Sequence, residues 1–108
     1  MKAPQGPSLK GSAFEYEIGE YHLRLTFEEE DKVHWLYRSA PDGLTGKNAV
    51  ETVDRLTLRN DIVLVAWKEA DGTNVIDVLD LTRMRIFPNF VTAAGDRFSV
   101  EAPMIRVS

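Results

Sequence analysis

Apolar and polar residues alternate with a period of two along most of this chain, beginning at Ala13. In the first such segment the aromatic rings of Phe14 and Tyr16 share one side, and glutamates occupy the other. A period of two is the side-chain repeat of a β-strand with one buried face. The pattern therefore predicts about eight strands, with little or no helix, over residues 13–18, 21–28, 33–38, 48–58, 62–67, 73–81, 83–90 and 97–107.

Residues that favour tight turns separate these segments. Asp71-Gly72 and Asn60-Asp61 suit two-residue hairpins, because Gly, Asn and Asp tolerate a positive φ best. Gly19-Glu20 suits a hairpin turn with glycine first, whereas residues 39–46 form one longer loop. Short connections of this kind predict a meander of antiparallel strands.

A meander of this length leaves two strand edges unpaired unless it closes on itself. We therefore predict an all-β fold, a small closed up-and-down antiparallel barrel of about eight strands. A barrel of this size is filled by side chains or holds one small ligand. A two-sheet sandwich is the main alternative, but it normally needs longer crossover connections.

Composition limits the chain to one domain and excludes several partners. The 108 residues carry 13 Lys and Arg against 17 Asp and Glu, a net charge of −4. Residues 1–12 are rich in Pro, Gly, Ser and Lys, so we expect a flexible N-terminal arm before a single domain at 13–108. The negative balance argues against nucleic acid and anionic membranes as partners. With no secretory or membrane-spanning segment evident, we expect a cytoplasmic protein.

Cofactor and metal chemistry have few residues to use. There is no cysteine, and both histidines, His22 and His34, alternate onto the face opposite the aromatic side chains. A zinc site normally needs three or more protein ligands. We therefore predict no metal and no cofactor, which leaves carboxylates, arginine and aromatic rings for any chemistry.

The candidate site consists of polar residues that share strand faces with large aromatic rings. These are Trp35, Tyr37, Arg55, Trp67, Glu69, Asp77 and Asn89. Ligand pockets are mostly apolar with a few placed polar groups, which this set would provide. The alternative is that the tryptophans are core residues and that the charged groups face water or pair with one another. If Glu69 or Asp77 is buried, desolvation would raise its pKa and suit it to general acid or base work.

Three sequence stretches resemble the MoaF-like family, which is named after molybdenum cofactor biosynthesis protein F. They are YHLRLTF at 21–27, HWLY at 34–37 and VAWKEADGTNV at 65–75. The similarity extends over roughly residues 20 to 91, and it implies a calycin-type, lipocalin-like barrel. This agrees with the strand count, which was made without it.

Three functions remain open. The first is a non-enzymatic barrel that binds a small hydrophobic, aromatic or amphipathic metabolite, with Trp35, Tyr37 and Trp67 as walls. The second is a small lyase or isomerase that uses Glu69 or Asp77 as acid or base, with Arg55 as an anion clamp. The third is a fully packed structural barrel that forms a homodimer.

Overall fold

The computed structural model describes residues 7–108 and contains strands joined by turns, with no helix in that part of the chain. Residues 1–6 of the expected arm lie outside the described residues. The ten strands are β1 (Ala13–Ile18), β2 (Tyr21–Glu29), β3 (Lys32–Ser39), β4 (Asn48–Thr52), β5 (Asp54–Arg59), β6 (Ile62–Lys68), β7 (Asn74–Asp80), β8 (Arg85–Val91), β9 (Arg97–Ser99) and β10 (Ala102–Arg106).

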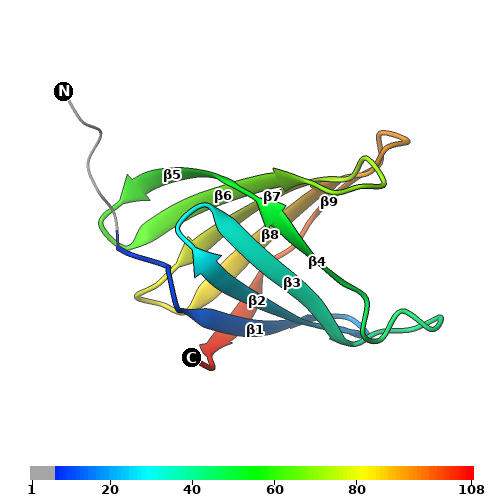
Figure 1. Cartoon of the computed structure of the whole chain (residues 1–108), viewed down its shortest axis with the longest axis horizontal. Coiled ribbons are helices and arrows are strands. Elements are labelled where there is room, and N and C mark those ends of the chain that lie inside the picture. The colour runs from blue at the N-terminus through cyan, green and yellow to red at the C-terminus, as the bar shows by residue number, and fades with distance from the viewer. Residues whose placement is uncertain (1–6) are drawn as a thin grey trace.

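The strands form one antiparallel sheet that curls into a nearly closed barrel (Figure 1). Neighbours follow the order β4-β3-β2-β1-β10-β8-β7-β6-β5, with β9 also paired to β8. The last strand, β10, lies between β1 and β8, so the two ends of the chain complete the wall. The all-β barrel fold predicted from the alternation is confirmed, and its seam lies between β4 and β5.

Two of the predicted strands are each divided in two. Segment 48–58 changes partner at Val53, because β4 pairs with β3 whereas β5 pairs with β6. Val53 is buried at this crossing, and its N–H donates to the Asp31 carbonyl at 2.8 Å. Segment 97–107 divides near Val100, whose N–H donates to the Pro88 carbonyl. Alternation alone does not reveal a change of partner, so the count of about eight was low.

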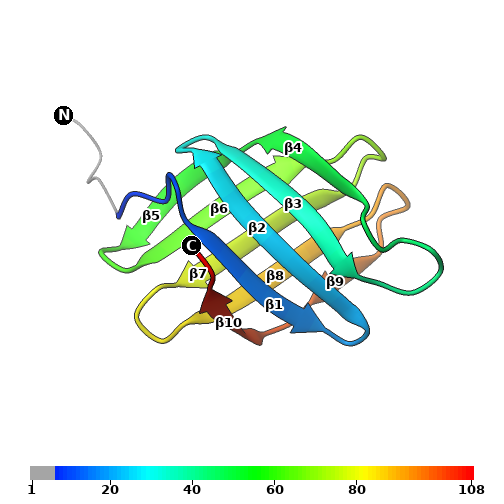
Figure 2. The same cartoon turned by 60° about the horizontal axis from the view of Figure 1, so that its bottom comes forward.

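The barrel end where β1 begins and β10 ends, which can be located in Figure 2, is densely packed. Completely buried side chains fill it, namely Phe14, Phe27, Val33, Val63, Leu79 and Ile86. Leu9 joins this core with no exposed surface, and the Gly11 N–H donates to the Phe27 carbonyl at 2.8 Å. Residues 7–12 thus pack onto the barrel, whereas the sequence analysis left them outside the fold. They carried no signal there because one buried leucine has no periodicity.

Four connections gather at the opposite end of the barrel. They are the β1–β2 turn, the loop at 40–47, the β6–β7 turn and the β8–β9 turn (Figure 2). Gly72, in the β6–β7 turn, has φ +92°, and a Cβ there would come within 3.0 Å of the Ala93 Cβ. Glycine is therefore required both by the backbone and by the neighbouring hairpin. These connections surround the mouth of a cavity.

Candidate functional site

A cavity of about 440 Å³ occupies the barrel interior at the end where these four connections meet. Its walls come mainly from apolar and aromatic side chains that alternate inward on strands β1, β2, β3, β6, β7 and β8. Three of the predicted residues, Trp35, Tyr37 and Trp67, lie in these walls. The packed core begins below the cavity, so only one half of the barrel is open.

Three aromatic rings form a continuous wall across β2 and β3. The Tyr21 and Tyr37 ring centroids are 5.5 Å apart in an edge-to-face arrangement, and those of Trp35 and Tyr37 are 5.3 Å apart. Alternation on β3 turns Trp35 and Tyr37 to the same side, and the ladder places Leu23 opposite Tyr37. Contacts between rings hold each other's orientation, so this wall keeps its shape without a ligand.

Each tryptophan in the wall donates its indole N–H to a carboxylate. Trp67 Nε1 donates to Glu69 Oε2 at 3.2 Å, and Trp35 Nε1 donates to Glu51 Oε2 at 3.0 Å. Glu69 also lines the cavity, as predicted from its place beside Trp67. Glu51 was not among the predicted site residues, although its alternation with Ala49 and Val53 on segment 48–58 indicates that it faces inward.

The negative charges of the carboxylates near the cavity shift one another's pKa values. Burial raises the pKa of Glu69; the hydrogen bond from Trp67 opposes this, and the charges of Asp71 and Glu51 raise the pKa further. Burial also raises the pKa of Tyr37, and the charge of Glu69 adds to the effect. Lys47 at the rim acts in the opposite direction on Glu69. Negative charge therefore dominates this end of the barrel.

Asp77 lies deeper, below the cavity wall. It faces inward on β7 between Val65 and Pro88, two residues along from the wall residue Val75. It has no exposed surface, and neither carboxylate oxygen has a hydrogen-bond partner among the described residues. Burial, with the charge of Glu69, raises the pKa of Asp77 well above its ordinary value. Burial, with the charge of Asp77, does the same to the pKa of Tyr16, which lines the cavity.

Two predicted site residues lie elsewhere. Arg55 donates from Nη1 to Glu30 Oε1 at 3.0 Å and from Nη2 to the Pro7 carbonyl, so it fastens the N-terminal segment to the packed end. Asn89 lies on the outer face, where its Nδ2 donates to the Ile76 carbonyl at 3.1 Å. Neither residue lines the cavity. Arg55 faces inward as expected, but at the opposite end from Glu69.

The histidines lie on the outer face of the barrel. His22 Nε2 is 2.8 Å from Glu15 Oε1, and His34 Nε2 is 3.1 Å from Asn48 Oδ1. Burial alone would raise the pKa of Glu15, but hydrogen bonds from Arg38, His22 and Arg24 outweigh it and lower that pKa to about 2. No group of three or more potential metal ligands is present within residues 7–108.

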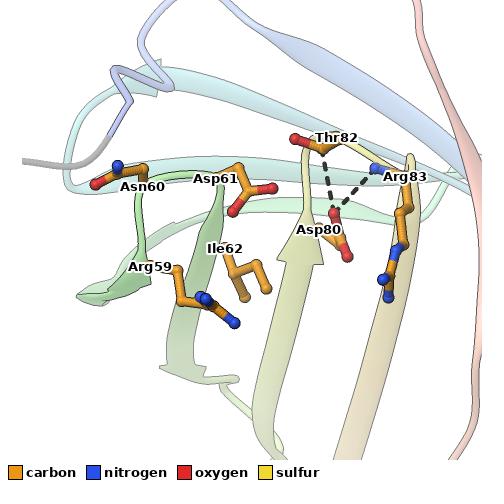
Figure 3. A pocket seen from close by; sticks show the side chains of 7 residues that line it. All are labelled: Arg59, Asn60, Asp61, Ile62, Asp80, Thr82 and Arg83. Atoms are coloured by element: carbon orange, nitrogen blue, oxygen red, sulfur yellow. Dashed lines mark hydrogen bonds between the residues drawn. The ribbon is translucent and has the colours of Figure 1, made fainter.

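A second hollow, of about 390 Å³, lies at the packed end between the β5–β6 and β7–β8 turns (Figure 3). The carboxylate of Asp80 lies in its lining. Asp80 Oδ1 already accepts hydrogen bonds from the backbone N–H groups of Thr82 at 3.2 Å and Arg83 at 3.0 Å. Figure 3 shows these two bonds closing the turn, with the Asn60 side chain directed away from them. The hollow is a gap between two turns, and the Asp80 carboxylate within it stabilises the backbone of the β7–β8 turn.

Fold and cavity together define a small antiparallel barrel, open at one end, with an aromatic and acidic interior. The chain belongs to the MoaF-like family, whose model matches residues 10–104 and so confirms the resemblance noted in the sequence. No curated protein matches it. No helix in the described part of the chain has the length and apolarity needed to cross a bilayer.

The barrel also resembles a solved structure. A crystal structure named "putative beta-lactamase" from Burkholderia vietnamiensis matches with a TM-score of 0.83 and 19% sequence identity. The match covers 96% of this chain and 100% of the other. At this level of identity the similarity concerns the fold alone.

Proposed function

We propose that this protein binds a small organic molecule with an apolar, partly aromatic body in the cavity at the open end of the barrel. The observation that carries the proposal is the cavity itself, about 440 Å³ in volume, with the rings of Trp35, Tyr37 and Trp67 in its walls. Binding pockets for small molecules have volumes of about 300–1,000 Å³ and are mainly apolar with a few polar groups.

Binding without chemistry fits the lining better than catalysis does. No cysteine, serine or histidine is found among the described residues that line the cavity. Arg55 is not among the residues that line the cavity, so the lyase hypothesis lacks the anion clamp that it assigned to this residue. The second candidate is therefore limited to acid or base work by Glu69, which lines the cavity and has a raised pKa.

The homodimer remains a separate proposal, and it concerns the outer face. Leu56 and Leu58 on β5 are 55% and 47% exposed, next to the barrel seam. Leu56 pairs with Leu64 of β6, which extends the apolar surface onto the next strand. Sedimentation of the wild type and of Leu56→Lys would test it, since a dimer through this face should dissociate in the variant.

The neutral fluorophore N-phenyl-1-naphthylamine tests the binding proposal directly. Its emission should rise on transfer from water into the cavity, and the fluorescence of Trp35 and Trp67 should change along the same titration curve. Val100→Trp, in the cavity wall, should abolish the response by occupying the volume. Val50→Trp adds the same bulk at a position that is 53% exposed, and it should bind like the wild type. Equal binding by both variants would exclude the cavity as the site.

A further inference from the structure

The charges around the cavity are unevenly distributed. Glu69 lies in the wall, Asp71 lies at the mouth, and Glu51 stands behind Trp35, to which it is hydrogen-bonded. Among the described residues that line the cavity, Lys47 alone carries positive charge, and it is exposed at the rim. Arg55 also faces inward, but it is bound to Glu30 at the packed end. The interior therefore has an excess of negative charge.

The cavity lining offers hydrogen-bond acceptors as well as donors. The Trp35 and Trp67 indole N–H groups are both used by carboxylates, at 3.0 and 3.2 Å. A carboxylate that accepts one such bond keeps further lone pairs free. Glu69 can therefore still accept a hydrogen bond from a ligand that brings a donor, while the hydroxyls of Tyr16, Tyr21 and Tyr37 can both donate and accept.

Aromatic faces in the wall also favour a cation. The rings of Tyr21, Tyr37 and Trp35 contact each other along one wall, with centroids 5.3–5.5 Å apart. A cation over the face of a tryptophan or tyrosine is attracted by the ring quadrupole, and more strongly where water is excluded. Rings and carboxylates at one site are complementary to an organic cation.

An unpartnered carboxyl lies below the cavity. Asp77 is completely buried, points into the barrel and has no hydrogen-bond partner in the described structure. Burial and the charge of Glu69 raise the pKa of this carboxyl. A positive charge in the cavity would be attracted by Glu69 and would lower the pKa of Asp77 toward its ordinary value.

We propose that the natural ligand is an organic cation: an ammonium group, attached to an aromatic or apolar body, that lies against Glu69 and the Trp35–Tyr37 wall. This inference rests on the proposed binding function and names its ligand class. The apolar body would pack against the wall formed by Leu23, Leu25 and Val75, and the ammonium group would face the mouth.

Three probes of nearly equal size and different charge test it by calorimetry: 2-phenylethylammonium, 2-phenylethanol and phenylacetate. We expect the cation to bind at least about tenfold more tightly than the alcohol, because only the cation can form an ion pair with Glu69 and a cation–π contact with the rings. Phenylacetate should bind weakest of the three. Equal or tighter binding of the alcohol or the acid would overturn the cation proposal while leaving the binding function intact. Absence of binding by all three would contradict both.

Variants separate charge pairing from shape. Glu69→Gln should remove most of the preference for the cation and leave the affinity for 2-phenylethanol unchanged. Glu28→Gln makes the same charge change at an exposed position on β2, at the packed end, and should bind all three probes like the wild type. Lys47→Gln should strengthen binding of the cation several-fold. An equal loss for all three probes in Glu69→Gln would mean that Glu69 only shapes the wall, and would overturn the proposal.

Discussion

The two ends of the barrel interior are built from the same strands but from different side chains. At the end near the termini, Phe14, Phe27 and Leu79 fill the interior, and Leu9 joins them from the N-terminal segment. At the other end, Trp35 and Tyr37 surround a space that they do not fill. The same alternation thus produces a packed core at the end where aliphatic and Phe side chains face inward and the N-terminal segment adds Leu9. It produces a cavity at the end where Trp and Tyr rings face inward and four connections surround the mouth.

Truncating one large ring at each end should show the difference most strongly. Phe27→Ala should lower the free energy of unfolding by about 3–5 kcal/mol, because Phe27 is completely buried and leaves a void among close-packed neighbours. Tyr37→Ala, in the cavity wall, should cost less than about 2 kcal/mol, since its ring already borders open space.

Urea unfolding of both variants, followed by tryptophan fluorescence, measures these costs. Phe27→Ala should keep its affinity for N-phenyl-1-naphthylamine under conditions where it is folded, whereas Tyr37→Ala should lose affinity. Equal losses of unfolding free energy in the two variants would show that the cavity end is packed as well, which would contradict the difference between the two ends.

Asp77 lies at the boundary between the ends and should produce the next largest effect. Its pKa is raised in the folded protein, so the folded state holds a proton that the unfolded chain releases above pH of about 4. Stability should therefore fall as the pH rises from that value toward the folded pKa. Asp77→Asn removes this dependence and should raise the free energy of unfolding at pH 7 above that of the wild type.

Thermal unfolding between pH 4 and pH 8 checks both the sign and the source of this effect. The wild-type midpoint should decline across the range more steeply than that of Asp77→Asn. Parallel curves for the two proteins would mean that Asp77 has a partner in solution and ionises normally. Asp54→Asn, which makes the same change at an exposed position on β5, is the matched control.

The sequence predicts the walls of the site better than its depth or its mouth. Trp35, Tyr37, Trp67 and Glu69 were identified because each shares a strand face with another aromatic or apolar residue, and the structure places all four in the cavity lining. Asp77 was another candidate, and the structure places it on the inward face of β7, but alternation does not tell how deep along the barrel a residue lies. The cavity ends before Asp77.

The errors have a common physical cause. Alternation assigns a residue to a face, but the face that points inward and the end of the barrel that stays open depend on pairing between distant strands. Asn89 was placed in the cavity although Ile86, Pro88 and Phe90 occupy the inward face of β8. Arg55 faces inward but is used by Glu30 and Pro7, residues far from it in sequence. Lys47 and Asp71 at the mouth come from turns, where no periodicity operates.

The smallest difference is expected at the mouth, where a matched pair of glycines isolates it. Gly72 and Gly95 occupy equivalent places in two turns, with φ values of +92° and +91°. Their N–H groups donate to the Glu69 carbonyl at 2.9 Å and to the Thr92 carbonyl at 2.8 Å. A Cβ at Gly95 would meet nothing within 4 Å, whereas a Cβ at Gly72 would meet Ala93 at 3.0 Å.

Gly95→Ala should therefore cost about 1–2 kcal/mol for the left-handed backbone alone. Gly72→Ala should cost about 1 kcal/mol more, because the two hairpins must separate to admit the methyl group. Separation would also move Asp71 and Thr92 at the cavity rim, so Gly72→Ala should weaken binding of 2-phenylethylammonium and Gly95→Ala should not. Urea unfolding and calorimetry on both variants measure the two differences. Equal values for the two variants would show that the two hairpins are not in contact in solution. The mouth would then be wider than in this structure.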